Sequence, residues 1–569
     1  MLEKSEEGFR NGIVCLNWQA KFNLQKKEND MALISIIEDF HPLNNARLLD
    51  RAAELVQPLH HHVKEPVGGF KLKERYSPEK EEVVLHKVPH LAMGKGENLC
   101  LDFGTHLVGY LTLDLSYTGS HPDAPAFLKL KFAEQISELS ENTEDYDGWV
   151  SRSWIQEEYI HVDVLPAQLK LPRRYAFRYL KITMMDTSPK YKLVVKHAEC
   201  LTETSADVGK IKPWTSDGSG SALSAGEAER IGRIDEVALR TLANCMQDVF
   251  EDGPKRDRRL WMGDLRLQAL TNYVSFRNMD LVRRCLYLFG GSRFPDGRVS
   301  ACIFTEPTVQ ADDTYLFDYS LFYTVALEEY LSETNDEETL NELYDVAMQQ
   351  IEISLRKCKR TSAGLVITEE AAKDAFIDWT ENLDKRAAAQ AVLIFALRYG
   401  RRLARRKNDW SQANYLMEQL ELLKRGALEA FWDAERELFV SEGQVSPASQ
   451  IWMVLADVPE PEEANKLMKK VRASLNGQDQ SISAGDYPML TPYMHHYYVA
   501  AMLRAGMKDE AREHVLSYWG SMVDYGADTF FEAWDPAHPE ASPYGGAAIN
   551  SYCHAWSCTP AYFIRKGLI

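Results

Sequence analysis

The segment EDGPKRDRRLWMGD, residues 251–264, concentrates groups that could handle a charged transition state. Within fourteen residues it holds four carboxylates, four basic side chains and a tryptophan. Carboxyl groups can act as general acid and general base, and an indole ring can stack on the apolar face of a sugar. A salt-bridged surface loop is the competing interpretation, because charge runs are usually solvated.

The Asp252-Gly253-Pro254 sequence is expected to end the preceding helix. Glycine permits the left-handed turn that closes many helices, and proline cannot continue the hydrogen-bond ladder. The charged residues of the segment are also interleaved too closely for simple i,i+4 pairing along one helix. We therefore expect the residues after this turn to depart from helical geometry.

The composition is that of a folded protein, and 569 residues are enough for two domains. Apolar residues make up 45% and aromatic residues 11%, so some of the rings are candidates for lining a ligand site. The 84 acidic and 65 basic residues give a formal charge of -19, which repels phosphate backbones and anionic membranes. Nucleic acid and membrane partners are therefore not expected, and a neutral or cationic partner fits better.

The N-terminal sequence MLEKSEEGFRNG is charged and has no apolar run, so no secretory signal is expected, and no later stretch is long enough for a membrane span. The nine cysteines are scattered singly, which predicts reduced thiols in a cytoplasmic protein. No cluster of His, Cys and Asp has metal-ligand spacing, so neither a metal ion nor a cofactor is expected. Calcium among the acidic loops stays open as an alternative.

Residues 31–207 form short β-rich runs such as LDFGTHLVGYLTLDL, separated by Gly, Pro, Ser and Asp clusters. This pattern predicts a β-sandwich. A Gly- and Ser-rich stretch that begins at Trp214 is the expected linker, so we predict an accessory domain at 1–215 and a second domain at 216–569. The role of residues 1–30 is left open, although WQAKFNLQ alternates like one more strand.

Beyond the linker, apolar residues recur three and four positions apart through about a dozen segments, the spacing of amphipathic helices. Helices in antiparallel pairs could form a flat bundle, a solenoid or a closed toroid of six hairpins. No repeat of constant period is present in the sequence, which disfavours the solenoid.

The segment DGPKRDRRLWMGD resembles the signature of the short-motif branch of the bacterial α-L-rhamnosidases, glycoside hydrolase family 78. The resemblance includes the β half and continues through FIDW at 376–379, GADTFFEAWDP at 526–536 and NSYCHAWSCTPAYF at 550–563. It implies an N-terminal β-sandwich followed by an (α/α)6 barrel that hydrolyses terminal α-L-rhamnosides with inversion. Inversion requires two carboxyl groups about 6.5 to 9.5 Å apart.

Asp257 is the general acid that the resemblance implies. In the commoner branch the acid is a Glu at a position that a left-to-right alignment gives to Arg258, and an arginine cannot donate that proton. The twelve positions from Asp252 to Asp264 match the shorter branch, in which the carboxyl directly after Arg256 is the acid. The family usually has Glu there, so the shorter Asp257 is a departure from its pattern.

Glu532 matches the Glu of the family's G-A-T-T-x-W-E segment and is the implied general base. The two carboxylates come from opposite ends of the helical region, which a closed toroid brings together and an open array does not. The positions that match sugar-binding residues, or are candidates beside them, are Asp252, Arg256, Trp261, Asp264, Asp318, Trp379, Trp534 and His554. For two of them a core role is the alternative, namely His554 and Trp379.

Two other functions stay open. Related barrels host hydrolases and lyases for other deoxysugars or uronides, and the Asp at the acid position also fits a carbohydrate-binding protein without turnover. Without an export signal, the expected substrate is a small rhamnoside or oligosaccharide. The sequence lacks the C-terminal β-sandwich of many family members, so the rim is expected to be open or covered by a partner subunit in a homo-oligomer.

Overall fold

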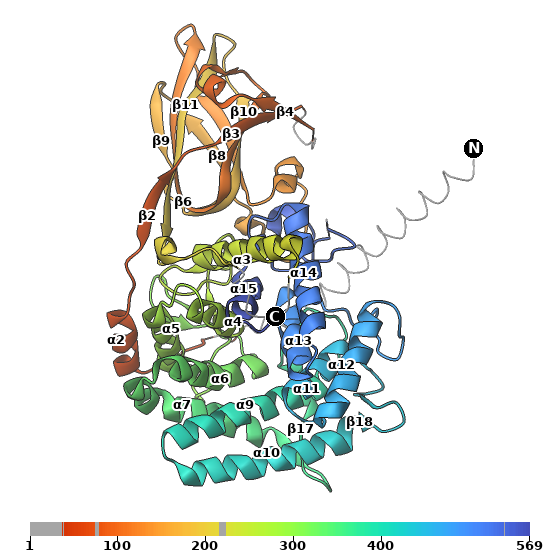
Figure 1. Ribbon diagram of the computed structural model, residues 1–569. Coiled ribbons are helices and arrows are strands. Elements are labelled where there is room, and N and C mark those ends of the chain that lie inside the picture. The colour runs from red at the N-terminus through yellow and green to blue at the C-terminus, as the bar shows by residue number, and fades with distance from the viewer. Residues whose placement is uncertain (1–36, 38, 74–78, 216–222, 540) are drawn as a thin grey trace, which may run out of the picture.

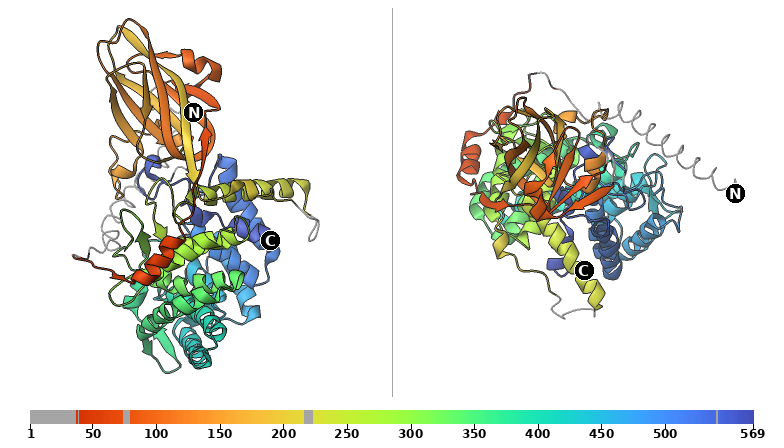
Figure 2. Two further views of the ribbon diagram at one scale, coloured as in Figure 1. Left: turned by 90° about the vertical axis from the view of Figure 1, so that its left-hand side faces the viewer. Right: turned by 90° about the horizontal axis from the view of Figure 1, so that it is seen from above.

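The computed structural model describes residues 37, 39–73, 79–215, 223–539 and 541–569. The strand suggested within residues 1–30 and most of the predicted linker lie outside these ranges. In the described residues, a sheet-rich domain stands on one end of a larger helical domain (Figure 1, Figure 2). The predicted fold class, a β domain followed by a six-hairpin barrel, is confirmed.

The sheet-rich domain contains ten antiparallel strands in one hydrogen-bonded network. Apolar side chains from these strands meet in a core of their own, which includes many Leu and Phe residues. The strands are β2 (His60–Lys64), β3 (Gly68–Leu72), β4 (Lys80–Val83), β5 (Ala92–Met93), β6 (Asn98–Gly119), β7 (Ala126–Ala133), β8 (Glu157–Val162), β9 (Ala167–Lys170), β10 (Tyr175–Asp186) and β11 (Tyr191–Thr204).

The long strand β6 connects the two layers of this domain. Residues 98–109 of β6 pair with β10, and part of the same stretch pairs with β3. Residues 109–119 pair with β11 instead, and residues 112–115 also with β9. The sheet thus folds over its own core, with alternate apolar side chains turned inward, as a sandwich requires.

One part of the predicted β region belongs to the helical domain. Strand β1 (Leu43–Asn44) pairs with β13 (Ser292–Arg293), and helix α2 (Ala46–Glu54) packs on α5 (Met279–Gly291). The prediction of a β region from about residue 31 is therefore wrong at α2. The sequence ARLLDRAAE has helix-forming residues and an N-capping Asn45 instead of alternation.

The contact between α2 and α5 is close and polar as well as apolar. The Arg284 side chain donates a 2.5 Å hydrogen bond to the carbonyl of Ala52, 232 residues away. A Cβ atom at Gly291 would lie 2.6 Å from the Leu49 side chain, so glycine allows this close approach without a shift of Leu49. The segment that precedes the sheet-rich domain in the sequence therefore packs on the helical domain.

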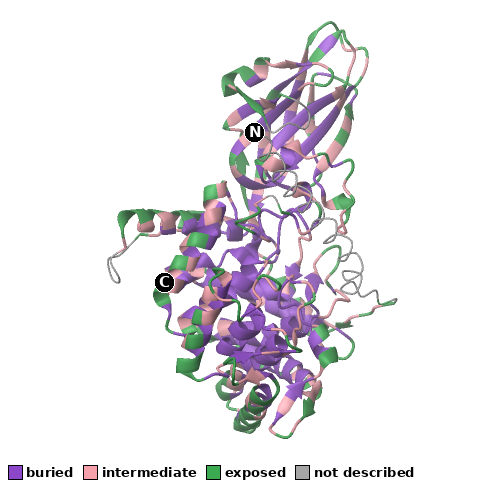
Figure 3. Cartoon of the chain, turned by 90° about the vertical axis from the view of Figure 1, so that its right-hand side faces the viewer, coloured by how far each residue is buried: buried purple, intermediate pink, exposed green. Residues whose placement is uncertain are grey.

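The helices of the second domain form two concentric sets. The outer set is α3 (Ala225–Cys245), α5, α7 (Glu337–Arg356), α10 (Trp410–Phe431), α12 (Pro461–Leu475) and α14 (Lys508–Tyr525). The inner set is α4 (Met262–Tyr273), α6 (Phe317–Thr334), α9 (Arg386–Arg406), α11 (Pro447–Leu455), α13 (Pro492–Arg504) and α15 (Pro560–Arg565). Every residue of α4 is buried, whereas α10 is largely exposed, and Figure 3 shows this buried centre.

The ring of inner helices is closed. Helix α4 packs on α6, α6 on α9, α9 on α11 and α11 on α13, and the 3₁₀ turn at Ala555–Ser557 contacts both α13 and α4. The last helix, α15, packs on α3 and α4. The start and the end of the domain therefore meet, as the toroid predicts. In the described ranges, no helix combines the length and the apolar character needed to cross a membrane.

Candidate active site

The motif at 251–264 lies in a loop between α3 and α4. Helix α3 already ends at Cys245, so the prediction that Asp252-Gly253-Pro254 ends it is wrong. The left-handed residues are Asp257, with φ 65°, and Arg258, with φ 53°, and not the glycine. The backbone N–H and the carboxylate of Asp252 close the loop on Arg259, with hydrogen bonds of 3.0 and 2.9 Å.

The backbone of Asp257 is strained, because side chains with a Cβ rarely adopt positive φ. Such strain persists where surrounding contacts impose it, and it is often found at functional sites. The closed loop directs the Asp257 side chain to a position where 23% of its surface is exposed. The other carboxylates of this site are almost fully buried, so Asp257 is the one nearest to solvent.

Glu532 is buried and held by three partners. The Tyr544 hydroxyl donates a 2.5 Å hydrogen bond to one carboxylate oxygen, and the Arg256 guanidinium donates to the other. The Glu532 carbonyl accepts from the Trp556 indole at 2.9 Å. Burial alone would raise the pKa of Glu532, but the charges of Arg256 and His554 and the Tyr544 hydrogen bond lower it below its usual value.

Arg256 contacts both candidate catalytic carboxylates. Its second terminal nitrogen lies 3.7 Å from an oxygen of Asp257. Both carboxyl groups contact the same guanidinium, so the distance between them is limited by its width and the two contacts. This distance therefore does not exceed the upper end of the roughly 6.5 to 9.5 Å range of an inverting pair. The guanidinium also stacks on Tyr544, with 4.2 Å from its central carbon to the ring centroid.

His554 lies among three buried carboxylates. Its ring nitrogens are 3.7 Å from Asp252, 3.6 Å from Asp264 and 3.9 Å from Glu532. Burial alone would lower the pKa of His554, but Asp252, Glu532 and Asp264 together raise it to about 9. Burial raises the pKa of Asp264 to about 8 and that of Asp252 to about 6. At neutral pH the imidazole therefore carries a proton in the middle of this cluster.

Several buried polar atoms of the cluster have no hydrogen-bond partner among the described residues. They are Oδ1 of Asp264, Nδ1 of His554 and Nε of Arg256. Buried polar groups are almost always paired in folded proteins, and leaving one unpaired costs about 1 to 3 kcal/mol. An unpaired acceptor and unpaired donors in one buried cluster are suited to the hydroxyl groups of a sugar.

Aromatic rings connect Trp261 and Trp379 to the same cluster. Trp261 meets Tyr319 edge to face at 6.4 Å, and Tyr319 meets Phe376 at 5.7 Å. Phe376 contacts both Trp379, at 5.4 Å, and Trp556, which lies 4.3 Å from the His554 ring. The structure therefore brings the two predicted tryptophans to one aromatic wall beside the carboxylates.

Asp318 is buried in the first turn of α6, and both of its carboxylate oxygens accept hydrogen bonds from the protein. Its two oxygens accept hydrogen bonds from the backbone N–H groups of Phe376, at 2.9 Å, and Ile377, at 3.0 Å. Ile377 has a φ of 57°, so this carboxylate holds a strained turn that carries Trp379. These hydrogen bonds show that Asp318 positions the turn, and its direct contact with the sugar remains a prediction.

The Trp534 side chain contacts residues outside the carboxylate cluster around His554. Its indole nitrogen donates to the Ser521 hydroxyl at 2.8 Å, and its ring packs on Tyr525 and Phe531. These contacts place it in the packing between α14 and the loop of Glu532, and substrate binding by Trp534 remains a prediction.

Sequence reasoning missed Tyr544, the hydrogen-bond donor to Glu532. It lies in the segment ASPYGGA, whose Pro and Gly residues indicate a turn without marking the tyrosine. Sequence reasoning also missed the sheet-rich domain as part of the site. Glu141 accepts hydrogen bonds from the backbone of Ala547 and Ala548, and the Tyr146 hydroxyl donates to the carbonyl of Tyr544 at 2.9 Å.

A buried ion-pair network fixes the motif to the sheet-rich domain. The Lys255 ammonium lies 2.5 Å from Glu138 and 3.8 Å from Glu134, and it donates to the carbonyl of Asn550 at 2.8 Å. Glu134 in turn accepts from the backbone N–H of Tyr552 at 2.7 Å. Lys255 thus links the start of the motif, the segment that leads to His554, and the sheet.

We expect Lys255→Met to lower the free energy of unfolding by about 3 to 5 kcal/mol, because it leaves Glu138 buried without its counter-charge. Urea unfolding followed by tryptophan fluorescence measures this loss. Lys210→Met is the matched control, because Lys210 pairs with Asp207 at the exposed surface, where loss of an ion pair has little effect on stability. Equal losses in the two variants would contradict the role of Lys255.

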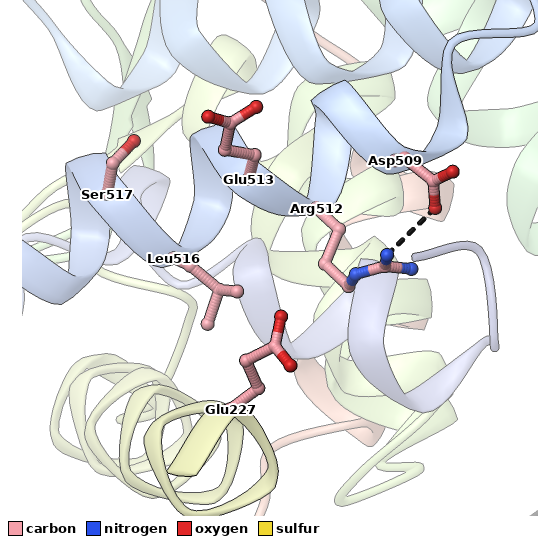
Figure 4. Close-up of a pocket in the computed structure, with 6 residues that line it drawn as sticks. All are labelled: Glu227, Asp509, Arg512, Glu513, Leu516 and Ser517. Atoms are coloured by element: carbon pink, nitrogen blue, oxygen red, sulfur yellow. Dashed lines mark hydrogen bonds and ion pairs between the residues drawn. The ribbon is translucent and has the colours of Figure 1, made fainter. Parts of the chain in front are cut away.

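A hollow on the surface, shown in Figure 4, is separate from this cluster. It lies between the start of α3 and α14, and Arg512 pairs there with Asp509 at 2.8 Å. Its lining residues are Glu227, Asp509, Arg512, Glu513, Leu516 and Ser517, none of which belongs to the candidate site.

Two family models match the chain. The model of the glycosyl hydrolase family 78 alpha-rhamnosidase N-terminal domain matches residues 73–202. The model of the bacterial alpha-L-rhamnosidase 6 hairpin glycosidase domain matches residues 225–568, more than half of the chain. No curated protein matches the sequence.

Solved structures of rhamnosidases are similar to this chain. A rhamnosidase from Klebsiella oxytoca with rhamnose bound is 44% identical, with a TM-score of 0.85, over 93% of this chain and 100% of that chain. A family 78 rhamnosidase of Bacillus sp. GL1 is 20% identical, with a TM-score of 0.67, over 85% of this chain and 49% of that one. A Streptomyces avermitilis alpha-L-rhamnosidase complexed with L-rhamnose is 14% identical, with a TM-score of 0.61, over 90% of this chain and 44% of that one. The last two likenesses concern the fold alone.

Proposed function

Because the chain belongs to the bacterial alpha-L-rhamnosidases of glycosyl hydrolase family 78, we propose that it hydrolyses terminal α-L-rhamnosides with inversion at the anomeric carbon. One observation carries the proposal. Asp257 and Glu532, from opposite ends of the helical domain, both contact the Arg256 guanidinium and lie beside buried polar atoms without partners. This is the arrangement that two carboxyl groups flanking a glycosidic bond require.

The roles follow from the environment of each carboxyl group. Asp257 protonates the glycosidic oxygen as the bond to the anomeric carbon breaks, and the leaving group departs as an alcohol. Glu532 takes a proton from a water molecule, whose oxygen attacks the opposite face of the sugar. Arg256 and Tyr544 favour the ionised form of Glu532, which a general base needs.

The buried cluster is the proposed site of the rhamnose ring. Asp252, Asp264 and His554 hold its hydroxyl groups, and Trp261 and Trp379 contribute to the aromatic wall around it. A protonated His554 donates hydrogen bonds, the Asp252 carboxylate accepts them, and Asp264, whose pKa is about 8, can donate through its proton or accept through its other oxygen, so both requirements of a hydroxyl group are met.

Small rhamnosides or oligosaccharides are the proposed substrates, and the cytoplasm is the proposed location. The eight cysteines in the described residues are free, including Cys245 and Cys553, whose sulfur atoms are 4.0 Å apart. Thiols that stay unpaired at such a distance fit a reducing compartment.

Hydrolysis of 4-nitrophenyl α-L-rhamnoside, followed by proton NMR, tests the proposal. We expect β-L-rhamnose as the first product, followed by slow mutarotation, because water attacks the face opposite the leaving group. Initial release of the α anomer would refute inversion. Binding of rhamnose without hydrolysis would refute the catalytic function and leave a sugar-binding protein.

A further inference from the structure

The segment between β7 and β8 of the sheet-rich domain reaches the mouth of the candidate site. The 3₁₀ turns at Ile136–Ser140 and Arg152–Trp154 bracket this segment. It packs on the loop that carries Tyr544, in an apolar cluster that includes Ile155 and Ile549. The sheet-rich domain therefore supplies part of the rim.

Trp149 is fixed in this rim by polar and aromatic contacts. Its indole nitrogen donates to the carbonyl of Pro543 at 3.2 Å. Its ring lies 5.6 Å from that of Tyr544 and 6.0 Å from that of Trp379, with tilts of 46° and 56°. Tyr146, three residues earlier, also donates to the carbonyl of Tyr544, so a second polar contact anchors the segment to the same loop.

The leaving group is expected to extend toward solvent, past Asp257. The unpaired polar atoms that would hold the sugar are buried, whereas the Asp257 side chain is partly exposed. Since Asp257 must contact the glycosidic oxygen, the leaving group extends from the sugar toward solvent on the side of Asp257. Tyr544, which stacks on Arg256 beside Asp257, is the ring that Trp149 contacts.

The rings of the aromatic wall differ in how far they are exposed. Tyr544 and Phe376 are 1% and 7% exposed, whereas Trp149 and Trp379 are partly exposed. Two neighbouring indole rings that keep an open surface at the mouth of a site can bind a flat apolar group by stacking. A sugar ring held by hydrogen bonds deeper in the cluster does not need them.

We propose that Trp149 is a specificity-determining residue, and that it forms with Trp379 a platform for planar aromatic leaving groups. The proposal rests on the proposed rhamnosidase function and adds the class of aglycone. The sheet-rich domain thereby selects the substrate, although the residues assigned to catalysis lie in the helical domain.

The test compares two substrates that share the sugar and differ in the leaving group. These are 4-nitrophenyl α-L-rhamnoside, with a planar ring, and α-L-rhamnosyl fluoride, with a single atom. We expect Trp149→Ala to lower kcat/KM for the aryl rhamnoside about five- to tenfold, mainly through KM, as loss of one stacking ring would do. The value for the fluoride should stay within about twofold, and Trp149→Phe should recover most of the aryl activity.

Trp154→Ala is the matched control, because Trp154 lies on the same segment and packs on the same apolar cluster as Trp149, but among the described residues only Trp149 has ring contacts with Tyr544 and Trp379. Equal losses for both substrates in Trp149→Ala, or the same selective loss in Trp154→Ala, would overturn the proposal. If Trp149→Ala does not fold, Trp149→Phe and Trp149→His are compared in its place, and an unchanged ratio between the two substrates refutes the platform. Failure of the proposed function is distinct, because the wild type would then hydrolyse neither substrate.

Discussion

Glu532→Gln is expected to lower kcat for 4-nitrophenyl α-L-rhamnoside by at least about 100-fold, because a general base typically contributes that much or more. Glutamine keeps the shape of the side chain and can still accept from Tyr544, but it cannot take a proton from water. The loss should be similar for good and poor leaving groups, since the base acts on the water and not on the departing oxygen. Steady-state kinetics with both kinds of substrate measures it.

The stability of the Glu532→Gln variant must be checked, because Arg256 loses a buried counter-charge. Thermal unfolding shows whether the variant is folded at the assay temperature. Asp535→Asn is the matched control, since Asp535 lies on the same loop with 47% of its side chain exposed, and it should keep wild-type activity. A folded Glu532→Gln variant with wild-type kcat would remove Glu532 from the role of base.

Asp257→Asn is expected to lower kcat/KM for methyl α-L-rhamnoside by at least about 100-fold, because an alkoxide leaves slowly without a proton donor. The loss should shrink to about tenfold or less for 2,4-dinitrophenyl α-L-rhamnoside, whose leaving group needs little protonation. This dependence on the leaving group distinguishes an acid from a residue that only binds the sugar. Kinetics across a series of aryl rhamnosides measures how steeply kcat/KM depends on the pKa of the leaving group.

Asp296→Asn serves as the control for this variant, because Asp296 forms an exposed ion pair with Arg298 and is in none of the contacts of the site. An equal loss for methyl and dinitrophenyl rhamnosides in Asp257→Asn would rule out the acid role. Asp257→Glu restores the length that the family usually has. If Asp257 is the acid, this variant should keep activity on methyl rhamnoside well above that of Asp257→Asn.

Much of the architecture could be predicted from local patterns. Alternation along β6 and the three- and four-residue spacing in α9 depend on side chains that turn inward from one element, so they are visible in the sequence. Helix α2 was missed because it has only nine residues and lies beside β-rich runs. Its helix-forming residues and its capping Asn45 are the indications of a helix in this segment.

The composition of the site was less predictable. The motif residues Asp252 and Asp264 and the distant His554 do meet, because closure of the toroid joins the two ends of the domain. Tyr544 and the backbone partners of Asp318 could not be assigned from the sequence, because these contacts are made by loops that only the complete fold brings together. The contribution of the sheet-rich domain, through Glu138 and its neighbours, could not be predicted for the same reason.

The docking of α2 on α5 has a consequence for synthesis of the chain on the ribosome. Ala52 emerges 232 residues before its partner Arg284, which corresponds to roughly 10 to 50 s of translation. The sheet can complete its own core in that interval, because all ten strands lie between His60 and Thr204. The first helix of the described chain therefore stays without its packing surface while the domain after it folds, and it takes its place only when the barrel begins to form.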